Sequence, residues 1–356
     1  MKYILISFML ISINTLAIAQ EKFEKVNSYS DDLIDPTQLI AFEDADDNTV
    51  FIVDPSNRNS ILRKLDLSDR KEIGRQRYGH GPGEVTGTGR MIISPYEEGY
   101  WVWDSAAQRG MIYDENLNFI EDITSSGGAQ SFVAPVSNQN VATWSIFSMD
   151  QFVNTRKISK DLDIHDEVSN SISNDDYTEL NPIAANPLVR QGETVADGSS
   201  IFKTFQYASY VIKITSDGID YIASEPEPIG FPESESDGDG FSAPSHSDFP
   251  KATLDATADS RYIYTLHSGR KFDEGRVREV ILTITGKMSE LEIEYNSSDR
   301  VLVFGKQTGT FVDEITLPER AELIAATDTY FNIYTTFERN EGEIIQYRKS
   351  EHFTVE

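Results

Sequence analysis

A glycine-rich stretch, "YGHGPGEV" at residues 78–85, contains residue types that often contact ligands. The phosphate-binding pattern G-x-G-x-x-G would require a glycine in place of Glu84, and no helix is expected to follow. Pro82 also removes a backbone donor, and the Glu84 carboxylate would repel a phosphate. The stretch is therefore predicted to be a turn whose glycines permit positive φ. Within it, His80 and Glu84 contact a ligand, or Glu84 instead caps exposed backbone amides.

Basic side chains in and near this turn form a candidate ligand-binding surface. In the fold proposed below, one rim of the molecule carries seven residues: Arg75, Arg77, His80, Glu84, Arg109, His267 and Arg270. Arginine holds anionic groups through paired hydrogen bonds, so we expect an anionic or polar ligand such as an acidic sugar. The alternative is that these arginines only neutralise nearby carboxylates.

The sequence predicts no catalytic residue and no metal site. Neither G-x-S-x-G nor H-E-x-x-H occurs, and the neighbours of His246 in "APSHSDFP" point apart, so they cannot form a triad. The five histidines lack the spacing of zinc ligands. Ca²⁺ is the one cofactor with candidate ligands, in an acidic loop at 225–250: Glu233, Glu235, Asp237 and Asp239. A solvated loop is the alternative for that segment.

The elements that would position these residues are short β-strands. Runs rich in Val, Ile, Tyr, Phe and Thr recur in triplets, and the second strand of each unit begins near residues 50, 100, 141, 200, 262 and 331. Six units of about four antiparallel strands indicate an all-β, six-bladed β-propeller. A two-sheet sandwich is the alternative, but it does not explain the recurring triplet.

Several details of this propeller can be predicted. Ring closure should pair residues 23–29 with the strand at 343–348, and an insertion at 272–298 should project from the fifth blade, with an extra hairpin. The tryptophans should pack between blades: Trp101, Trp103 and Trp144. Three aspartates that end strands should form turns: Asp54, Asp104 and Asp114.

Composition limits the classes of partner. The 356 residues include 31 basic and 59 acidic side chains, which gives a net charge of −28. Such a surface repels phosphate backbones, so no nucleic-acid partner is expected. A hydrophobic content of 39% is ample for a large core, and the chain is expected to be a monomer.

The N-terminal residues have the features of a signal peptide. Lys2 precedes the apolar run "YILISFMLISI", and Ala17 and Ala19 form a small-x-small cleavage pattern. The run is shorter than the roughly 20 residues that a membrane span needs. We therefore predict a signal peptide at 1–19, a propeller at 20–356 and a periplasmic or secreted protein without a membrane span. The absence of cysteine excludes a lipid-attachment cysteine and disulfides.

Two stretches of the chain, each made of two segments, resemble a known family. The segments "GRQRYGHGPGEV", "GYWVWDSAAQRGMIYDENLNFIEDI", "RYIYTLHSGRKF" and "RVLVFGKQTGTFVDEITL" are similar to those of exported six-bladed β-propellers of the TolB-like and NHL-like kind in Bacteroidota. The resemblance implies an exported propeller and leaves its biochemistry open.

Two functions are compatible with these features. The first is a non-enzymatic binding or scaffold propeller that holds a glycan, a peptide or a partner protein. The second is a metal-dependent lactonase-type or lyase-type enzyme, which would need several ligands converging on the channel-lining strands. "RMIIS" and "ELIAA", two such strands, supply almost none, so binding is favoured.

Overall fold

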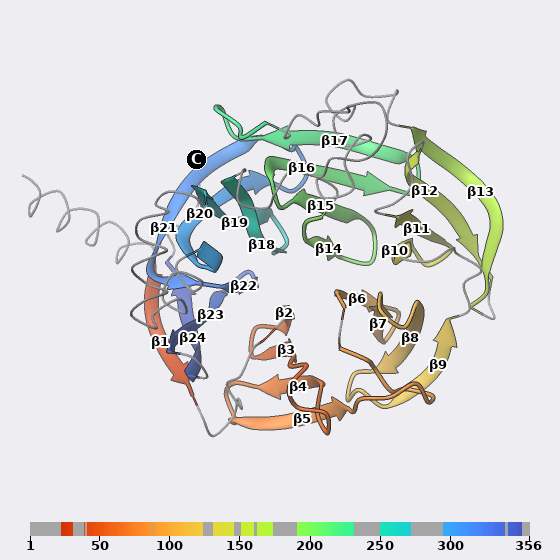
Figure 1. Cartoon of the computed structure of the whole chain (residues 1–356), viewed down its shortest axis with the longest axis horizontal. Coiled ribbons are helices and arrows are strands. Elements are labelled where there is room, and N and C mark those ends of the chain that lie inside the picture. The colour runs from red at the N-terminus through yellow and green to blue at the C-terminus, as the bar shows by residue number, and fades with distance from the viewer. Residues whose placement is uncertain are drawn as a thin grey trace, which may run out of the picture.

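The structure, a computed structural model, consists of strands arranged in a ring (Figure 1). It describes residues 23–30, 39, 41–87, 89–123, 131–145, 151–159, 162–173, 191–230, 250–271, 295–338 and 341–350. These residues form 24 strands in six four-stranded antiparallel sheets. The predicted all-β, six-bladed propeller is therefore confirmed.

Each blade is named in chain order and its strands are given from the axis outward. Blade 1 comprises β2 (Ala41–Asp46), β3 (Thr49–Val53), β4 (Leu62–Asp66) and β5 (Lys71–Gln76). Blade 2 comprises β6 (Met91–Tyr96), β7 (Gly99–Asp104), β8 (Arg109–Asp114) and β9 (Phe119–Ile123). Blade 3 comprises β10 (Ser131–Ser137), β11 (Asn140–Ser145), β12 (Gln151–Ile158) and β13 (Ile164–Ser173).

The remaining blades follow the same order. Blade 4 comprises β14 (Thr194–Ala196), β15 (Ile201–Phe205), β16 (Ala208–Thr215) and β17 (Gly218–Ser224). Blade 5 comprises β18 (Pro250–Ala258), β19 (Tyr262–Lys271), β20 (Ser298–Gly305) and β21 (Phe311–Ala321). Blade 6 comprises β22 (Leu323–Ala326), β23 (Tyr330–Glu338), β24 (Glu341–Lys349) and β1 (Phe23–Tyr29).

The second strands of the blades begin where the hydrophobic pattern predicted them. They are β3, β7, β11, β15, β19 and β23, and each starts within one residue of its predicted position. Their side chains are largely buried because both faces of a blade are covered by neighbouring blades. The sequence signal is correspondingly strong, since such strands are apolar on both faces.

The ring is closed by the N-terminal strand. β1 pairs antiparallel with β24 and forms the outer edge of blade 6, with Phe23 opposite Lys349 and Tyr29 opposite Ile344. Phe23 and Tyr29 are both buried. The predicted pairing of residues 23–29 with the C-terminal strand is confirmed.

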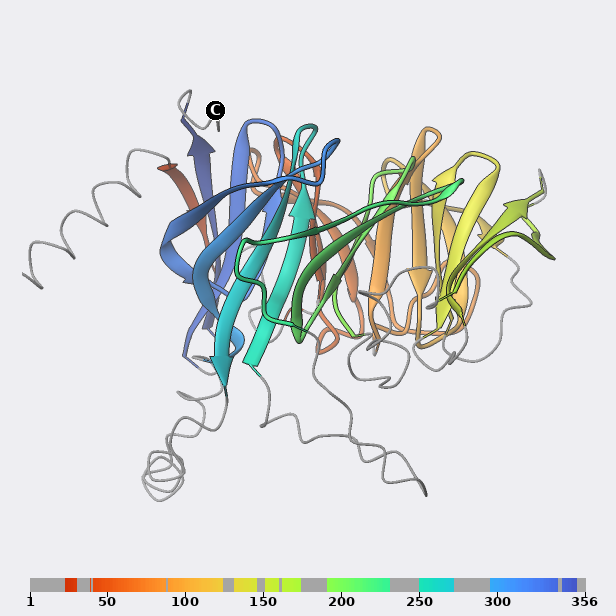
Figure 2. The same ribbon diagram turned by 90° about the horizontal axis from the view of Figure 1, so that it is seen from above.

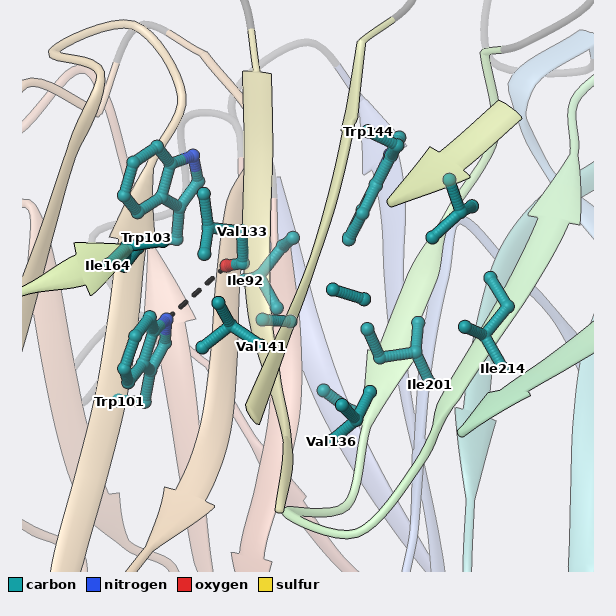
Figure 3. Close-up of a cluster of buried hydrophobic side chains, with 14 of the residues drawn as sticks. Ile92, Trp101, Trp103, Val133, Val136, Val141, Trp144, Ile164, Ile201 and Ile214 are labelled. Carbon is teal, nitrogen blue, oxygen red and sulfur yellow. Dashed lines mark hydrogen bonds between the residues drawn. The ribbon is translucent and has the colours of Figure 1, made fainter. Parts of the chain in front are cut away.

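The largest apolar cluster joins blades 2, 3 and 4 (Figure 3). Trp101 and Trp103 of β7 and Trp144 of β11 all contribute to it, as predicted. The indole N–H of Trp101 donates to the carbonyl of Val133 at 3.3 Å, so its one polar group is satisfied across the blade boundary. The tryptophans therefore fix how neighbouring blades pack.

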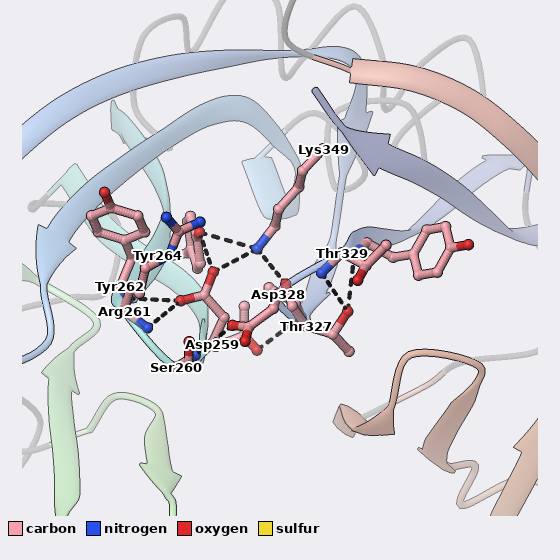
Figure 4. A network of polar contacts seen from close by, with 12 residues as sticks. Asp259, Ser260, Arg261, Tyr262, Tyr264, Thr327, Asp328, Thr329 and Lys349 are labelled. Carbon is pink, nitrogen blue, oxygen red and sulfur yellow. Dashed lines mark hydrogen bonds and ion pairs between the residues drawn. The ribbon is translucent and has the colours of Figure 1, made fainter. Parts of the chain in front are cut away.

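A buried polar network joins blades 5 and 6 (Figure 4). Lys349, at the end of β24, lies 2.7 Å from a carboxylate oxygen of Asp259, and Tyr264 donates to the same oxygen at 2.6 Å. The side chains of Lys349 and Asp259 are 3% and 0% exposed. The network thus fixes the closing blade to its neighbour.

The three aspartates predicted to form turns do so. Asp54 accepts the N–H of Ser56, Asp104 accepts those of Ala106 and Ala107, and Asp114 accepts those of Asn116 and Asn118. Asp104 also bonds Thr86 of the preceding crossing, at 2.8 Å from the Thr86 hydroxyl. These carboxylates are occupied by local backbone, as expected of turn formers.

The face at which β2, β6, β10, β14, β18 and β22 begin is termed the entry face (Figure 2 views the ring edge-on). The crossing from blade 1 to blade 2 contacts the second-to-third connections of both blades there. Tyr78 N–H donates to the Arg58 carbonyl at 2.9 Å, and Ser105 N–H donates to the Arg90 carbonyl at 3.2 Å. These two kinds of connection therefore lie on the same face, the entry face.

Some predictions concern residues outside the described ranges. They are the signal peptide at 1–19, the hairpin within 272–298 and most of the acidic loop 225–250, including its four candidate calcium ligands. β19 ends at Lys271 and β20 begins at Ser298, so the insertion connects the second and third strands of blade 5. No helix in the described part of the chain is long and apolar enough to cross a membrane.

Candidate functional site

The glycine-rich turn is held together by its own charged residues. The Glu84 carboxylate accepts the N–H of Gly81 at 2.8 Å and pairs with Arg77 at 2.7 Å. The hydrogen bond from Gly81, aided by Arg77, lowers the pKa of the Glu84 carboxyl. Glu84 therefore caps a backbone amide, which is one of the two roles expected from the sequence.

Arg109 of β8 contacts the same turn through its guanidinium group. Its guanidinium donates to the carbonyls of His80 and Gly81 at 2.9 and 2.8 Å, and also to that of Glu84. Of the three glycines in the turn, Gly83 alone has positive φ, at 70°. The turn is thus a closed structure in which the guanidinium of Arg109 is engaged with backbone.

The seven predicted rim residues do not all come together. The structure groups Arg77, His80, Glu84 and Arg109 at the boundary of blades 1 and 2. Arg75, on β5, bonds Ser60 at 3.3 Å. His267 and Arg270 lie on β19 of blade 5. The backbone of Arg270 is opposite Lys251.

His267 is buried, with 2% of its surface exposed, although the sequence suggested a rim position. Its Nε2 lies 3.9 Å from a Glu225 carboxylate oxygen, and it faces Arg300 across the strand pair. Burial, with a smaller contribution from Arg300, lowers the pKa of His267 to about 4. His267 is therefore a neutral, buried histidine inside the blade, and the prediction that it is an exposed ligand contact is wrong.

A different group of residues surrounds a cavity at the inner edge of blades 2, 3 and 4. This axial cavity has a volume of about 200 Å³. Its lining includes charged, polar and aromatic side chains: Arg90, Phe132, Trp144, Glu193, Thr194 and Lys203. Arg90 precedes β6 and Glu193 precedes β14, so the cavity lies at the entry-face end of these strands.

The charged pair at this end is within reach of solvent. Arg90 and Glu193 form an ion pair at 3.0 Å, and their side chains are 37% and 29% exposed. A partly exposed pair of this kind contributes little to stability. It can therefore exchange partners with an incoming anion at small energetic cost.

Lys203 is a buried residue in the lining of the axial cavity. It lies on β15 opposite Thr194, and its residue is 4% exposed. Its Nζ donates to the Gly192 carbonyl at 2.7 Å and is 3.4 Å from that of Glu193. Burial, together with the nearby Arg90 guanidinium, lowers the pKa of Lys203 to about 7.

Two more ionisable groups on β18 extend this cluster. Lys251 donates to Asn296 at 2.6 Å and lies 4.4 Å from the centre of the Tyr295 ring. Burial, and then Arg90, lower the pKa of Lys251 to about 8. Burial, and then the Glu193 carboxylate, raise the pKa of Asp255, which accepts the Ile324 N–H at 2.7 Å. Burial and the Arg90 guanidinium thus make both lysines weaker bases than exposed lysines.

Two aromatic rings form the apolar side of the axial cavity. Phe132 of β10 and Trp144 of β11 are stacked, with centroids 5.6 Å apart and planes 13° apart. Apolar and aromatic walls with a few placed polar groups are typical of small-molecule sites. The axial cavity combines both.

Sequence reasoning missed the axial cavity. The sequence predicts a strand that begins near residue 200, but it assigns no role to Lys203 within that strand. The available signal is a lysine inside a strand that is otherwise apolar or threonine, where solvation of an ammonium is hard to provide. Among the described residues, no group of three or more His, Cys, Asp or Glu side chains is placed to hold a metal ion.

Comparisons with known proteins concern the fold. No family model matches the chain, and no curated protein matches its sequence. A Bacteroides fragilis protein whose name describes it as exported is 11% identical, with a TM-score of 0.52 over 92% of this chain and 94% of that one. Virginiamycin B lyase from Staphylococcus aureus is 12% identical, with a TM-score of 0.45 over 91% and 99%.

A third similar structure is the β-propeller domain of Cps50 (Swd1) from Myceliophteria thermophila. It is 9% identical, with a TM-score of 0.44 over 92% of this chain and 100% of that one. The Bacteroides fragilis structure shows a shared fold, and at 11% identity it carries no residue roles to this chain. The chain is a six-bladed β-propeller with an aromatic and basic cavity at its axis.

Proposed function

We propose that this protein is an exported, non-enzymatic binding propeller, and that its axial cavity holds a carboxylate-bearing end of a glycan or peptide. The carrying observation is the arrangement of Arg90 and Lys203 beside stacked rings in a cavity of about 200 Å³. Sites for drug-sized ligands measure about 300–1,000 Å³, so this cavity fits one terminal group. The surrounding chain carries −28, so basic groups facing one cavity are a local exception.

An anion in the cavity would reverse the effects that lower the pKa values of Lys203 and Lys251. An added negative charge favours the protonated form of each amine. Binding should therefore take up protons near neutral pH, and affinity should fall as pH rises through the pKa values of these two amines, about 7 and about 8. A neutral ligand held only by the rings would show no such dependence.

Calorimetric titration with methyl glucuronide and its neutral parent, methyl glucoside, tests this proposal. The glucuronide should bind, and Arg90→Gln should weaken binding by at least about tenfold, because a hydrogen bond to a charged group contributes about 1.5–3 kcal/mol. Arg348→Gln is the matched control, since Arg348 lies on β24 of blade 6, outside the cavity lining, and its side chain is 52% exposed. Equal affinity for the two sugars, or no effect of Arg90→Gln, would count against the site.

Export is tested separately by the mass of the protein recovered from producing cells. Cleavage after Ala19 leaves Phe23 and the whole of β1 in the mature chain, so processing is compatible with ring closure. A chain starting at Gln20 is expected, and it should elute as a monomer. The enzymatic alternative would be favoured instead by Ca²⁺ or Zn²⁺ that stays bound after dialysis in near-equal molar amount.

A further inference from the structure

Among the buried lysines of the described chain, Lys203 and Lys64 have no carboxylate partner, and only Lys203 lines the axial cavity. The amine of Lys64 donates to the Tyr100 hydroxyl and to the Glu115 carbonyl, both at 2.9 Å. The amine of Lys349 is paired with Asp259 at 2.7 Å, and that of Lys213 with Asp220 at 2.9 Å. Within the described part of the chain, no carboxylate lies within ion-pairing distance of the Lys203 Nζ; its contacts are two backbone carbonyls. The charge of Lys203 is therefore not balanced by a direct carboxylate partner.

The two carbonyls match the hydrogens of a neutral amine. A neutral lysine has two N–H donors and one lone pair, and the carbonyls of Gly192 and Glu193 accept the two donors. The lone pair is then directed away from both carbonyls, and Lys203 lines the axial cavity. Geometry of this kind presents a nucleophile to whatever occupies the cavity.

We propose that the Lys203 amine forms a reversible imine with a small oxo acid, a ligand that bears a carboxylate and an aldehyde or ketone. The inference rests on the proposed binding of a carboxylate in the axial cavity, where Arg90 would exchange Glu193, now 3.0 Å away, for the carboxylate of the ligand. The imine adds the aldehyde or ketone carbonyl of the ligand as a second group that the site recognises, beside the carboxylate. The pKa of Lys203, lowered to about 7, leaves much of the amine unprotonated at neutral pH.

The step is balanced without a further reactant. The amine nitrogen attacks the carbonyl carbon, the C=O bond breaks and a C=N bond forms. The two amine protons leave with the carbonyl oxygen as one water molecule. Hydrolysis returns the free amine and the unchanged oxo acid, so the protein holds its ligand covalently but reversibly.

Reductive trapping with limiting glyoxylate and cyanoborohydride at pH 7, followed by peptide mapping of the full-length chain, tests the proposal. Lys203 should gain a carboxymethyl group at least about tenfold faster than Lys71, whose side chain is 57% exposed. The hydrogen bond to Asp69 raises the pKa of Lys71, so its amine is almost wholly protonated at pH 7. The α-amino group serves as the internal positive control for the reagent. Labelling of Lys203 at the rate of Lys71 overturns the proposal.

Variants and pH separate this inference from the proposed function. Lys203→Arg should abolish the fast label, whereas Lys213→Met, which removes a carboxylate-paired lysine, should leave it unchanged. The labelling rate should rise with pH through about 7, opposite to the trend expected for anion affinity. A protein that binds methyl glucuronide but does not label Lys203 retains its carboxylate site and lacks the imine, which overturns the inference alone. Fast labelling without glucuronide binding supports a reactive amine and removes the proposed glycan site.

Discussion

At the scale of single residues, burial decides which charged groups are available to a ligand and which hold the fold. Arg77, Glu84 and Arg109 looked accessible in the sequence, yet their charges are used by each other and by backbone groups of the turn. Lys203, an ordinary strand residue in the sequence, lines a cavity and donates its amine hydrogens to backbone carbonyls. The seven-residue rim surface stays a prediction, to be tested by joint replacement of Arg77, His80 and Arg270 by alanine.

The buried pair between Lys349 and Asp259 gives a first prediction. Lys349→Met should lower the free energy of unfolding by about 3–5 kcal/mol, because it leaves a buried carboxylate without its cation. Lys71→Met is the control: it removes an exposed pair with Asp69 at 2.6 Å and should cost no more than about 1 kcal/mol. Urea denaturation at pH 7 measures both. Equal losses in the two variants would contradict the structural role of the network.

His267 gives a second prediction, on pH. In the unfolded chain it binds a proton near pH 6.5, whereas in the folded chain burial and Arg300 lower its pKa and keep it neutral down to about pH 4. The stabilisation is thus present above pH 6.5 and is lost as pH falls toward 4. Glu225 and Glu314 are the acidic groups that oppose the effect.

Between pH 7 and 5, the wild-type chain should lose about 2 kcal/mol more of its unfolding free energy than His267→Gln does. Denaturant titrations at the two pH values measure the difference. Exposed His80→Gln is the control and should follow the wild type. Parallel losses in wild type and His267→Gln would show that His267 does not couple folding to protons.

At the scale of elements, the geometry of the glycine-rich turn gives the third prediction. Gly83 has φ of 70°, and a Cβ there would lie 2.7 Å from the Cβ of Phe119. Gly83→Ala should therefore lower the free energy of unfolding by more than about 1 kcal/mol, from backbone strain with steric overlap added. Gly230→Ala, where no atom lies within 4 Å of the added Cβ, should be close to neutral. Identical thermal midpoints for the two variants would be incompatible with this turn geometry.

The strands were predictable from the sequence to a greater extent than the site. β7 and β15 were predicted because residues buried on both sides give continuous apolar runs, and β1 because closure of the ring requires strands from the two chain ends to pair. The axial cavity was not predictable, because Arg90, Trp144 and Lys203 come from three blades and become neighbours only when the blades pack. His267 was misplaced for a related reason: β19 turns its side chain inward, toward Arg300 on the paired strand.

At the scale of the whole molecule, ring closure by β1 gives the fourth prediction. A chain beginning at residue 31 lacks β1, so the edge of β24 and the apolar surface covered by Phe23 and Tyr29 become exposed. We expect this chain to unfold at a clearly lower denaturant concentration than a chain beginning at Gln20, and to aggregate. Tryptophan fluorescence during urea titration follows both, because Trp101 and Trp103 report on blade 2, away from the deletion. An unchanged midpoint would mean that β1 is not needed for closure.

The pairing of β1 with β24 also determines when the sheet of blade 6 can be completed during folding. Phe23 and its partner Lys349 are separated by 349 − 23 = 326 residues. Chains are synthesised from the N-terminus at about 5–20 residues per second, so β1 waits roughly 16–65 s for the strand that completes its sheet. Contacts between such distant segments form slowly, since a long loop must close first. Any chain terminated before residue 341 lacks β24, which separates β23 from β1, so its blade 6 cannot form as a four-stranded sheet.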